Sequence, residues 1–284
     1  CDLAEIYMPV GRFEDAIRQA EVVIHLGTIP LILAARALKI LFNGYRSTGL
    51  HYKADQLMVE TNEIFKGDLD PTEVTTEIAQ AWIMYKMLRL ECMREQGKLE
   101  EGLELVDQLI WLDQREGSKD QALTAELVTF RSTLRWETAQ YQSAVSDLQL
   151  AIELYAKAGD HFNSESLYSN LGLVYWNIGE LDNAEKSLTR AIDFYHRTGS
   201  EQLATYDIGN LGLTYFARGN LAKALNLVLE HIDHSKRLNF ITELNRGKRN
   251  LPKILFYQGQ IEPALEELKA SIPYFEKRGS RYSY

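Results

Sequence analysis

The sequence predicts an all-α solenoid of about seven helix-turn-helix repeats, because one block of residues recurs along the chain at a nearly fixed interval. Three observations support this fold class. An alanine recurs every 40 residues in the second half of the chain, at Ala144, Ala184, Ala224 and Ala264. A glycine stands five residues before the last three of these alanines, at Gly179, Gly219 and Gly259. A leucine stands thirteen residues before the same three, at Leu171, Leu211 and Leu251.

Each repeat is expected to contain two helices. In the repeat near 160–199, apolar residues follow the three- and four-residue spacing of one helix face on both sides of Gly179. They are Leu167, Leu171, Val174 and Tyr175 before the glycine, and Ala184, Leu188, Ala191 and Ile192 after it. A second break closes the repeats at Gly159, Gly199, Asn239 and Gly279. Asparagine is the residue that best replaces glycine where the backbone turns left-handed, so these positions agree with one another.

The same block can be followed toward the beginning of the chain with less regular spacing. It recurs at Gly97–Gly102, Gly49–Ala54 and Gly11–Ala16, with intervals of 42, 48 and 38 residues. The seven expected repeats therefore lie near residues 1–30, 31–70, 78–115, 121–159, 160–199, 200–239 and 240–279, within a single solenoid over 1–284.

Both ends of the chain fall inside a repeat. The first helix lacks its opening turn, and Arg281–Tyr284 stands where an eighth repeat would begin. Because a solenoid needs polar capping repeats, we expect the chain to be cut from a longer protein at both ends.

Composition argues against several classes of function. The net charge of −9 disfavours nucleic acid as a direct partner, because neutralising phosphates supplies most of the non-specific affinity. There is no run of eighteen apolar residues to predict a membrane span, and the chain does not open on a signal-peptide pattern. Two cysteines, Cys1 and Cys92, favour a reducing, cytoplasmic setting.

No catalytic signature is found in the sequence. It contains no glycine-rich phosphate loop, no His-Glu-x-x-His and no Cys-x-x-Cys. His231 and His234 share a helical face, but zinc needs three or four ligands and the two histidines supply only two, so we interpret both as surface histidines. We therefore expect that the chain is not an enzyme, has no catalytic residues, and binds no metal and no cofactor.

These residues resemble the tetratricopeptide repeat. The repeat near 160–199 matches its pattern best, with Tyr168, Leu171, Gly172, Tyr175, Gly179, Ala184, Leu188 and Ala191. The family period is about 34 residues, so the interval of 40 implies helices about one and a half turns longer in total. This lengthened form is similar to the repeats of kinesin light chains and polarity adaptors. It is also similar to the sensor arms of bacterial signalling ATPases and of maltose-activator-type transcription regulators. The resemblance implies a right-handed superhelix and a function in binding.

The resemblance also implies that one face of each first helix lines a concave groove. In the fifth repeat this face comprises Ser166, Ser169, Asn170, Leu173, Trp176 and Asn177. In the sixth it comprises Tyr206, Gly209, Asn210, Leu213, Phe216 and Ala217. In the seventh it comprises Arg246, Arg249, Asn250, Lys253, Phe256 and Tyr257.

Three features coincide on this face. A basic stripe follows an i, i+3, i+4, i+7 spacing, at Arg246, Arg249, Asn250 and Lys253. A ladder of amides that can donate to and accept from a peptide backbone recurs at Asn170, Asn210 and Asn250. A ladder of aromatic rings that suit anchor pockets recurs at Trp136, Trp176, Phe216 and Phe256.

We predict that this face binds a protein or an extended peptide, with acidic groups of the ligand opposite the basic stripe. The predicted ligand-binding residues are Asn170, Trp176, Asn177, Tyr206, Asn210, Phe216, Arg246, Arg249, Asn250, Lys253, Phe256 and Tyr257.

A structural role is the alternative for each feature. The asparagines can bond between adjacent first helices, the rings can belong to the core between repeats, and the basic stripe can be an ordinary solvated face. Pro252 is expected to kink the first helix of the last repeat, and Pro273 to disturb its second helix.

Three functions fit such a chain. We favour a sensor or partner-binding arm of a larger cytoplasmic bacterial signalling or transcription regulator, in which the groove accepts a ligand and biases a neighbouring domain. A stand-alone adaptor that scaffolds two proteins would instead end in a polar capping helix. An accessory domain of an enzyme would be flanked by a catalytic motif.

Overall fold

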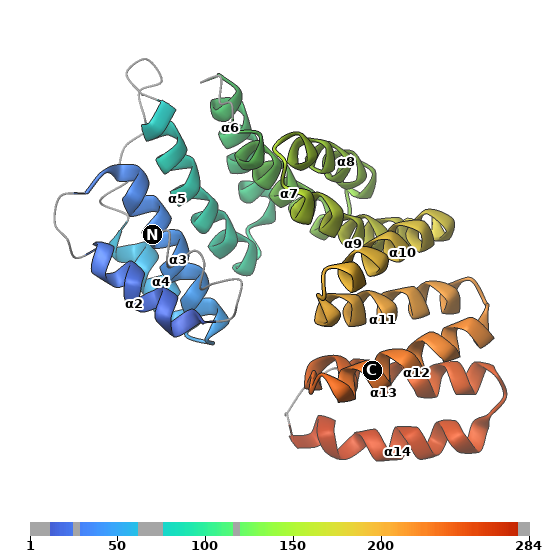
Figure 1. The fold of residues 1–284 in the computed structure, drawn as a ribbon. Coiled ribbons are helices and arrows are strands. Elements are labelled where there is room, and N and C mark those ends of the chain that lie inside the picture. The colour runs from blue at the N-terminus through green and yellow to red at the C-terminus, as the bar shows by residue number, and fades with distance from the viewer. Residues whose placement is uncertain (1–11, 25–28, 62–75, 116–119, 278–284) are drawn as a thin grey trace. The chain divides into compact units, whose positions relative to one another are not determined.

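The computed structural model describes residues 12–24, 29–61, 76–115 and 120–277. These residues form helices joined by short links, and no strand is found among them (Figure 1). The prediction of an all-α fold is therefore confirmed. No helix within these ranges is long and apolar enough to cross a membrane. The chain divides into two compact units, Cys1–Gln140 and Tyr141–Tyr284, and the division falls within the fourth expected repeat.

The first unit is less regular than the second. Its described helices are α2 (Phe13–Ile24), α3 (Leu31–Ser47), α4 (His51–Glu60), α5 (Thr76–Glu95), α6 (Leu99–Arg115) and α7 (Gln121–Glu137). Most helices contact their neighbours in the chain, and α3 also contacts α5 across the short α4. Leu38, Phe42 and Tyr85 are fully buried where α3 and α5 meet. Because α4 has 10 residues and α5 has 20, the interval between repeats drifts in this half of the chain.

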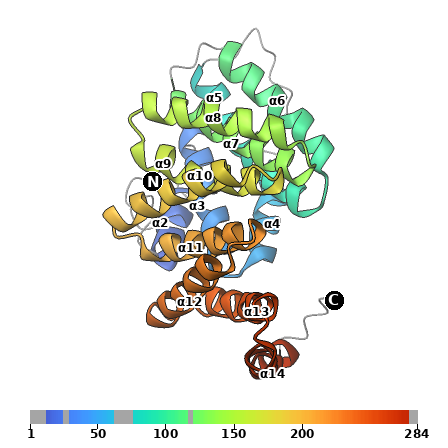
Figure 2. The ribbon, with the colours of Figure 1, turned by 90° about the vertical axis from the view of Figure 1, so that its right-hand side faces the viewer.

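The second unit repeats one helix length throughout. Its helices are α8 (Tyr141–Lys157), α9 (His161–Asn177), α10 (Leu181–Arg197), α11 (Glu201–Ala217), α12 (Leu221–Arg237), α13 (Ile241–Tyr257) and α14 (Ile261–Lys277). Each has 17 residues, and links of three residues separate them, so two helices and two links account for the interval of 40. Figure 2 shows α11 to α14 following one another in chain order.

The links between helices turn through a left-handed residue. Glycine occupies this position after most helices, with φ between 71° and 81° at Gly159, Gly179, Gly199, Gly219 and Gly259. Asn239 has φ 51°, so the interpretation of this asparagine as a replacement for glycine is confirmed. Ala139 has φ 58° and stands where the other repeats have glycine. After each left-handed residue the chain bonds back to the preceding helix, as where the Glu180 amide donates to the Tyr175 carbonyl at 3.0 Å.

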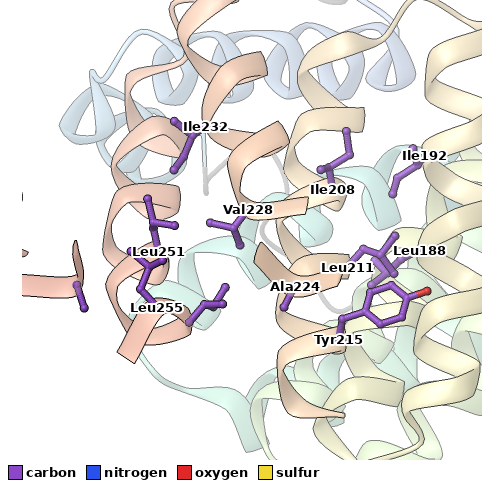
Figure 3. Packing of buried hydrophobic residues seen from close by; sticks show 12 residues of the cluster. Leu188, Ile192, Ile208, Leu211, Tyr215, Ala224, Val228, Ile232, Leu251 and Leu255 are labelled. Atoms are coloured by element: carbon purple, nitrogen blue, oxygen red, sulfur yellow. The ribbon is translucent and has the colours of Figure 1, made fainter. Parts of the chain in front are cut away.

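A continuous apolar core joins the repeats of the second unit. Figure 3 shows Leu188 and Ile192 of α10 facing Ile208 and Leu211 of α11, and the buried cluster continues through Val228 of α12. It reaches α13 and α14 at Leu251, Ile254, Leu255 and Ala264. Each valine, leucine or isoleucine of this cluster contributes about 1.5–3 kcal/mol by leaving water. The second unit is therefore held together by burial between successive helices, as expected for a solenoid.

The close packing of a helix pair depends on Gly172. A Cβ atom at this position of α9 would lie 2.6 Å from Cγ of Leu188 in α10. The glycine costs helix stability, but it lets the two helices approach where a larger residue would push them apart.

Pro252 and position 273, the two prolines expected to disturb the last repeat, both lie within helices that continue past them. The helix α13 runs from Ile241 to Tyr257 across Pro252, which is buried, and α14 runs across position 273 to Lys277. Pro252 has no amide hydrogen, so the Lys248 carbonyl has no donor four residues along the helix. Burial of Leu251, Ile254 and Leu255 holds this turn of α13 in place.

We predict that Ala139→Gly stabilises the protein. An alanine in the left-handed region costs about 1–2 kcal/mol, and the added entropy of the unfolded chain offsets about 0.4–1 kcal/mol of the gain. The free energy of unfolding should therefore rise by up to about 1 kcal/mol, measured by urea denaturation.

Gly179→Ala is the matched control, because Gly179 also has a positive φ and a Cβ there would meet no atom within 4 Å. This variant should lower the free energy of unfolding by a similar amount. A shift of both variants in the same direction would contradict the explanation by backbone strain.

Candidate functional site

The predicted site residues lie on three neighbouring helices of the second unit. The helix α11 contacts both α9 and α13, although each pair is separated by a second helix in the chain. These three are the first helices of their repeats, so side chains at equivalent positions are brought side by side. The site is therefore assembled from residues about 40 positions apart in sequence.

Most of the predicted residues are accessible. We call the accessible set the first-helix face, and it comprises Asn170, Trp176, Asn177, Tyr206, Phe216, Arg249, Lys253, Phe256 and Tyr257. Of these, Phe216 is half-buried and also packs against the apolar core, as the structural alternative for the aromatic ladder proposes. The fourth ring of that ladder, Trp136, belongs to the first unit.

The remaining predicted residues are engaged inside the protein. Asn210 and Asn250 are buried, and Arg246 is half-buried. The Arg246 guanidinium donates from Nη1 to Oδ1 of Asn210 at 2.7 Å and from Nη2 to the Tyr206 carbonyl at 2.7 Å. Its Cζ lies 4.5 Å from the centre of the Tyr206 ring. Its Nε lies 2.6 Å from Oε2 of Glu243. Arg246 thus ties α13 to α11.

A glycine on α11 makes room for this guanidinium. A Cβ atom at Gly209 would come within 2.5 Å of Nη2 of Arg246. The stripe of basic residues therefore divides in two. Arg246 is a clamp between repeats, whereas Arg249 and Lys253 point to solvent.

A buried carboxylate extends the clamp to α9. Asp207 of α11 is fully buried, and its Oδ1 accepts from Ser169 Oγ at 2.7 Å and from Asn210 Nδ2 at 3.3 Å. Hydrogen bonds therefore run from Ser169 on α9 through Asp207 and Asn210 to Arg246 on α13. Bonding between first helices, the structural alternative for the asparagine ladder, is what Asn210 does in the structure.

Burial raises the pKa of Asp207 to about 6, against the opposing effects of the hydrogen bonds from Ser169 and Asn210 and of the charge of Arg246. Its second oxygen, Oδ2, is buried and makes no hydrogen bond within the part of the chain that the structure describes. A carboxylate oxygen without a donor is costly to keep ionised in such a place.

On the other side of the clamp, Glu243 faces a buried histidine. His231 of α12 is 1% exposed, and its Nε2 lies 3.1 Å from Oε2 of Glu243. The interpretation of His231 as a surface histidine was therefore wrong. Burial opposes ionisation of Glu243, but the contact with His231 and the charge of Arg246 outweigh it and lower the pKa of this carboxyl. Gly247 leaves the space that His231 occupies, since a Cβ there would lie 3.0 Å from its Nδ1.

Two cations of the first-helix face have no ionic partner among the described residues. Arg249 and Lys253 of α13 are exposed, and neither forms an ion pair with any residue that the structure describes. They differ in this respect from Arg190 and Arg218, which pair with carboxylates on neighbouring helices. An exposed pair of cations one helical turn apart can bind a carboxylate or another anion.

An aromatic cluster lies one turn further along α13. The ring centres of Phe216 and Tyr257 are 5.3 Å apart at an interplanar angle of 81°, and those of Phe256 and Tyr257 are 6.0 Å apart at 88°. Phe256 is 60% exposed and Tyr257 is 67% exposed. Edge-to-face contacts hold the rings against one another, while most of the Phe256 and Tyr257 side chains stays exposed. Trp176 lies on α9, two repeats before α13, and is itself 40% exposed.

Sequence reasoning missed the buried acids and the histidine. Asp207, Glu243 and His231 are polar residues in positions that the packing buries. The signal that could have found them is a pair of glycines inside helices, Gly209 and Gly247, because glycine there costs about 1 kcal/mol unless something must approach closely. No cluster that could hold a metal ion is found among the residues that the structure describes.

Comparison with known proteins supports the fold. A family model described as tetratricopeptide repeat matches residues 165–195, which include most of α9 and α10. No curated protein matches this chain.

Three solved structures illustrate the likeness. A signal transduction ATPase with numerous domains and a tetratricopeptide repeat sensor, from Pyrococcus horikoshii, has a TM-score of 0.70 at 17% identity, covering 98% of this chain and 42% of that one. BtubC from P. vanneervenii has a TM-score of 0.64 at 14% identity, covering 82% and 92%. The Rap conjugation gene regulator of the plasmid pLS20, in complex with the Phr* peptide, has a TM-score of 0.57 at 14% identity, covering 98% and 76%. The chain is therefore similar to helical solenoids of the tetratricopeptide type.

We predict that Asn210→Ala destabilises the protein. The variant leaves Nη1 of Arg246 without its acceptor and removes a donor from Asp207, which should lower the free energy of unfolding by about 1–3 kcal/mol. Asn170→Ala is the control, because Asn170 holds the equivalent position on α9 and is exposed. It should change stability by less than about 0.5 kcal/mol. Equal losses in the two variants, measured by urea denaturation, would contradict a clamp specific to α11 and α13.

Asp207 should make stability depend on pH. Its folded-state pKa of about 6 exceeds the ordinary value of 3.8, so the folded protein binds the proton more readily and loses stability as pH rises through this window. Asp207→Asn cannot ionise but keeps an oxygen for Ser169 and Asn210. The free energy of unfolding of wild type minus that of the variant should fall by up to about 3 kcal/mol between pH 4 and pH 7. A difference that is constant over this range, in urea denaturation, would show that the carboxyl titrates normally.

Proposed function

We propose that this chain is a binding domain whose first-helix face accepts a protein or an extended peptide. We further propose that it serves as the sensor or partner-binding arm of a larger cytoplasmic bacterial signalling or transcription regulator. The observation that carries the proposal lies on α13, where Arg249 and Lys253, which form no ion pair within the described part of the chain, stand next to an exposed aromatic cluster. The proposed role is binding, without a catalytic step, a metal or a cofactor.

Charge favours an acidic ligand for this face. The chain carries a net charge of −9. None of the positions expected to line the groove on α9, α11 and α13 holds an aspartate or a glutamate, however. Two acids of these helices, Asp207 and Glu243, are buried and bonded to groups of the protein. Arg249 and Lys253 therefore form a positive region in an acidic chain. This region attracts an anionic ligand, whereas the acidic remainder of the surface repels one.

The aromatic rings would supply most of the affinity. Exposed clusters of large apolar side chains mark binding surfaces more often than single exposed residues do. Phe256, Tyr257 and Phe216 come from two helices and are held in contact by their edges, so a ligand would meet them without first ordering them. Rings held in this way are typical anchors of binding energy, with charged groups at the rim adding specificity.

The solved structures of similar fold support a sensor role. One is a signalling ATPase whose tetratricopeptide repeats are named as its sensor, and another is a conjugation regulator bound to a peptide. A ligand lying across α11 and α13 would favour one spacing of these helices, and a repeat array passes such a change to its next neighbour. The clamp formed by Arg246 with Asn210 and Tyr206 lies beneath the same surface.

We predict that Arg249→Glu/Lys253→Glu abolishes selection of acidic peptides. A random peptide library should be enriched in acidic sequences by the wild-type chain at low salt, and by the double variant at least about tenfold less, because both attractive charges become repulsive. Lys269→Glu is the control, since Lys269 is an exposed lysine on α14, which is not one of the three helices of the first-helix face.

Circular dichroism should show unchanged helicity in all variants. Equal enrichment by wild type and the double variant would rule out this pair of cations as the anion site. Loss of enrichment in the Lys269→Glu control as well would show that only the net charge of the chain matters.

A further inference from the structure

We infer that the ligand of the first-helix face is an extended peptide segment that carries an acidic side chain and an apolar side chain two residues apart. The inference rests on the proposed function and adds to it the spacing of the two groups. It follows from the order of exposed residues along α13 and from the different rise per residue of helices and extended chains.

The exposed residues of α13 define two seats in a fixed order. Arg249 and Lys253 are separated by one helical turn, so both can reach one carboxylate placed between them. Phe256 and Tyr257 follow on the same side of the helix, where Tyr257 contacts Phe216 of α11. We call the first pair the acid seat and the three rings the apolar seat.

The distance between the seats follows from helix geometry. The helix α13 is continuous from Ile241 to Tyr257, including the turn at Pro252. At a rise of about 1.5 Å per residue, the midpoint of the acid seat and the backbone of Phe256 are about 7–8 Å apart along the axis. An extended chain rises about 3.3 Å per residue, so two residues of ligand span about 6.6 Å. Flexible stems of arginine and lysine cover the small remainder.

Side-chain direction favours a separation of two over one or three. Successive side chains of an extended peptide point to opposite sides, so residues i and i+2 face the same surface. With a separation of one or three, an acidic group in the acid seat would turn the apolar side chain away from the rings. The preferred separation is therefore two residues, in either order along the ligand.

The neighbouring helix closes the apolar seat on one side. Phe216 places a ring from α11 against Tyr257, with ring centres 5.3 Å apart. The apolar side chain of the ligand would thus contact two repeats at once, whereas the acid seat belongs to α13 alone. The binding site spans α11 and α13, the two helices that Arg246 fixes to each other.

The experiment measures pair enrichment in a displayed random peptide library selected on the full 284-residue chain. For every pair of one acidic and one apolar residue, enrichment is plotted against separation. We expect separation two to exceed separations one and three by at least about fivefold, which corresponds to about 1 kcal/mol. Composition is the same at every separation, so net charge and hydrophobicity cannot produce the difference.

Two variants assign the seats. Phe256→Ala should abolish the preference for separation two while acidic residues stay enriched, because the acid seat is intact. Lys253→Gln should reduce the enrichment of acidic residues and leave apolar residues selected. Both side chains are exposed, and circular dichroism should confirm that neither variant alters the helices.

The possible results separate this inference from the proposed function. Acidic enrichment without a preferred separation, or with a preference for one or three, would overturn the inferred spacing and leave peptide binding in place. A preference for two that survives Phe256→Ala would place the apolar seat elsewhere and overturn the inference. No enrichment of any peptide would overturn peptide binding itself, and the inference with it.

Discussion

Register between repeats is the constraint on which the second unit depends. Each helix from α8 to α14 has 17 residues, and links of three residues join successive helices, so equivalent side chains return to equivalent places in successive repeats. The left-handed residue in each link is what permits so short a connection. Without this regularity the core between α10, α11, α12 and α13 could not be continuous, and residues far apart in sequence could not share one surface.

Residues of one basic stripe serve two purposes because of what lies opposite each of them. Arg246 faces Gly209, which leaves space for its guanidinium, and the Asn210 amide and Tyr206 carbonyl accept from it. Arg249 is one turn further along α13 and meets solvent instead. The stability of the array and the charge that a ligand would meet are thus assigned to adjacent turns of one helix. A change at the clamp would alter the spacing of the surface, and a change at Arg249 would alter only its charge.

The helices of the second unit could be predicted from sequence, because glycine and alanine at fixed positions report directly on backbone turns and close packing. The first unit was less predictable, since α4 and α5 depart from the common length. For the candidate site, the i, i+3, i+4, i+7 spacing correctly placed Arg249 and Lys253 on one exposed side of α13. The direction of Arg246 could not be predicted in the same way, because it depends on space left by a residue of another helix. The burial of His231 depends likewise on the space left by Gly247 in the next helix, which the spacing of residues in α12 does not report.

Because every helix and every link between helices in the second unit has the same length, whole repeats can be duplicated or removed without changing the backbone geometry at the junction. Removing or copying any 40 consecutive residues of the second unit rejoins equivalent backbone positions, so the junction itself is neutral. The polar contacts are not interchangeable, because the positions equivalent to Asp207 hold Leu167 and Gly247. If the repeat that holds Asn210 were duplicated, Asn210 of the first copy would face Tyr206 of the second copy, because Tyr206 occupies the position equivalent to Arg246. The backbone therefore leaves the number of repeats free to vary, while the side chains between α9 and α13 specify the order of neighbours.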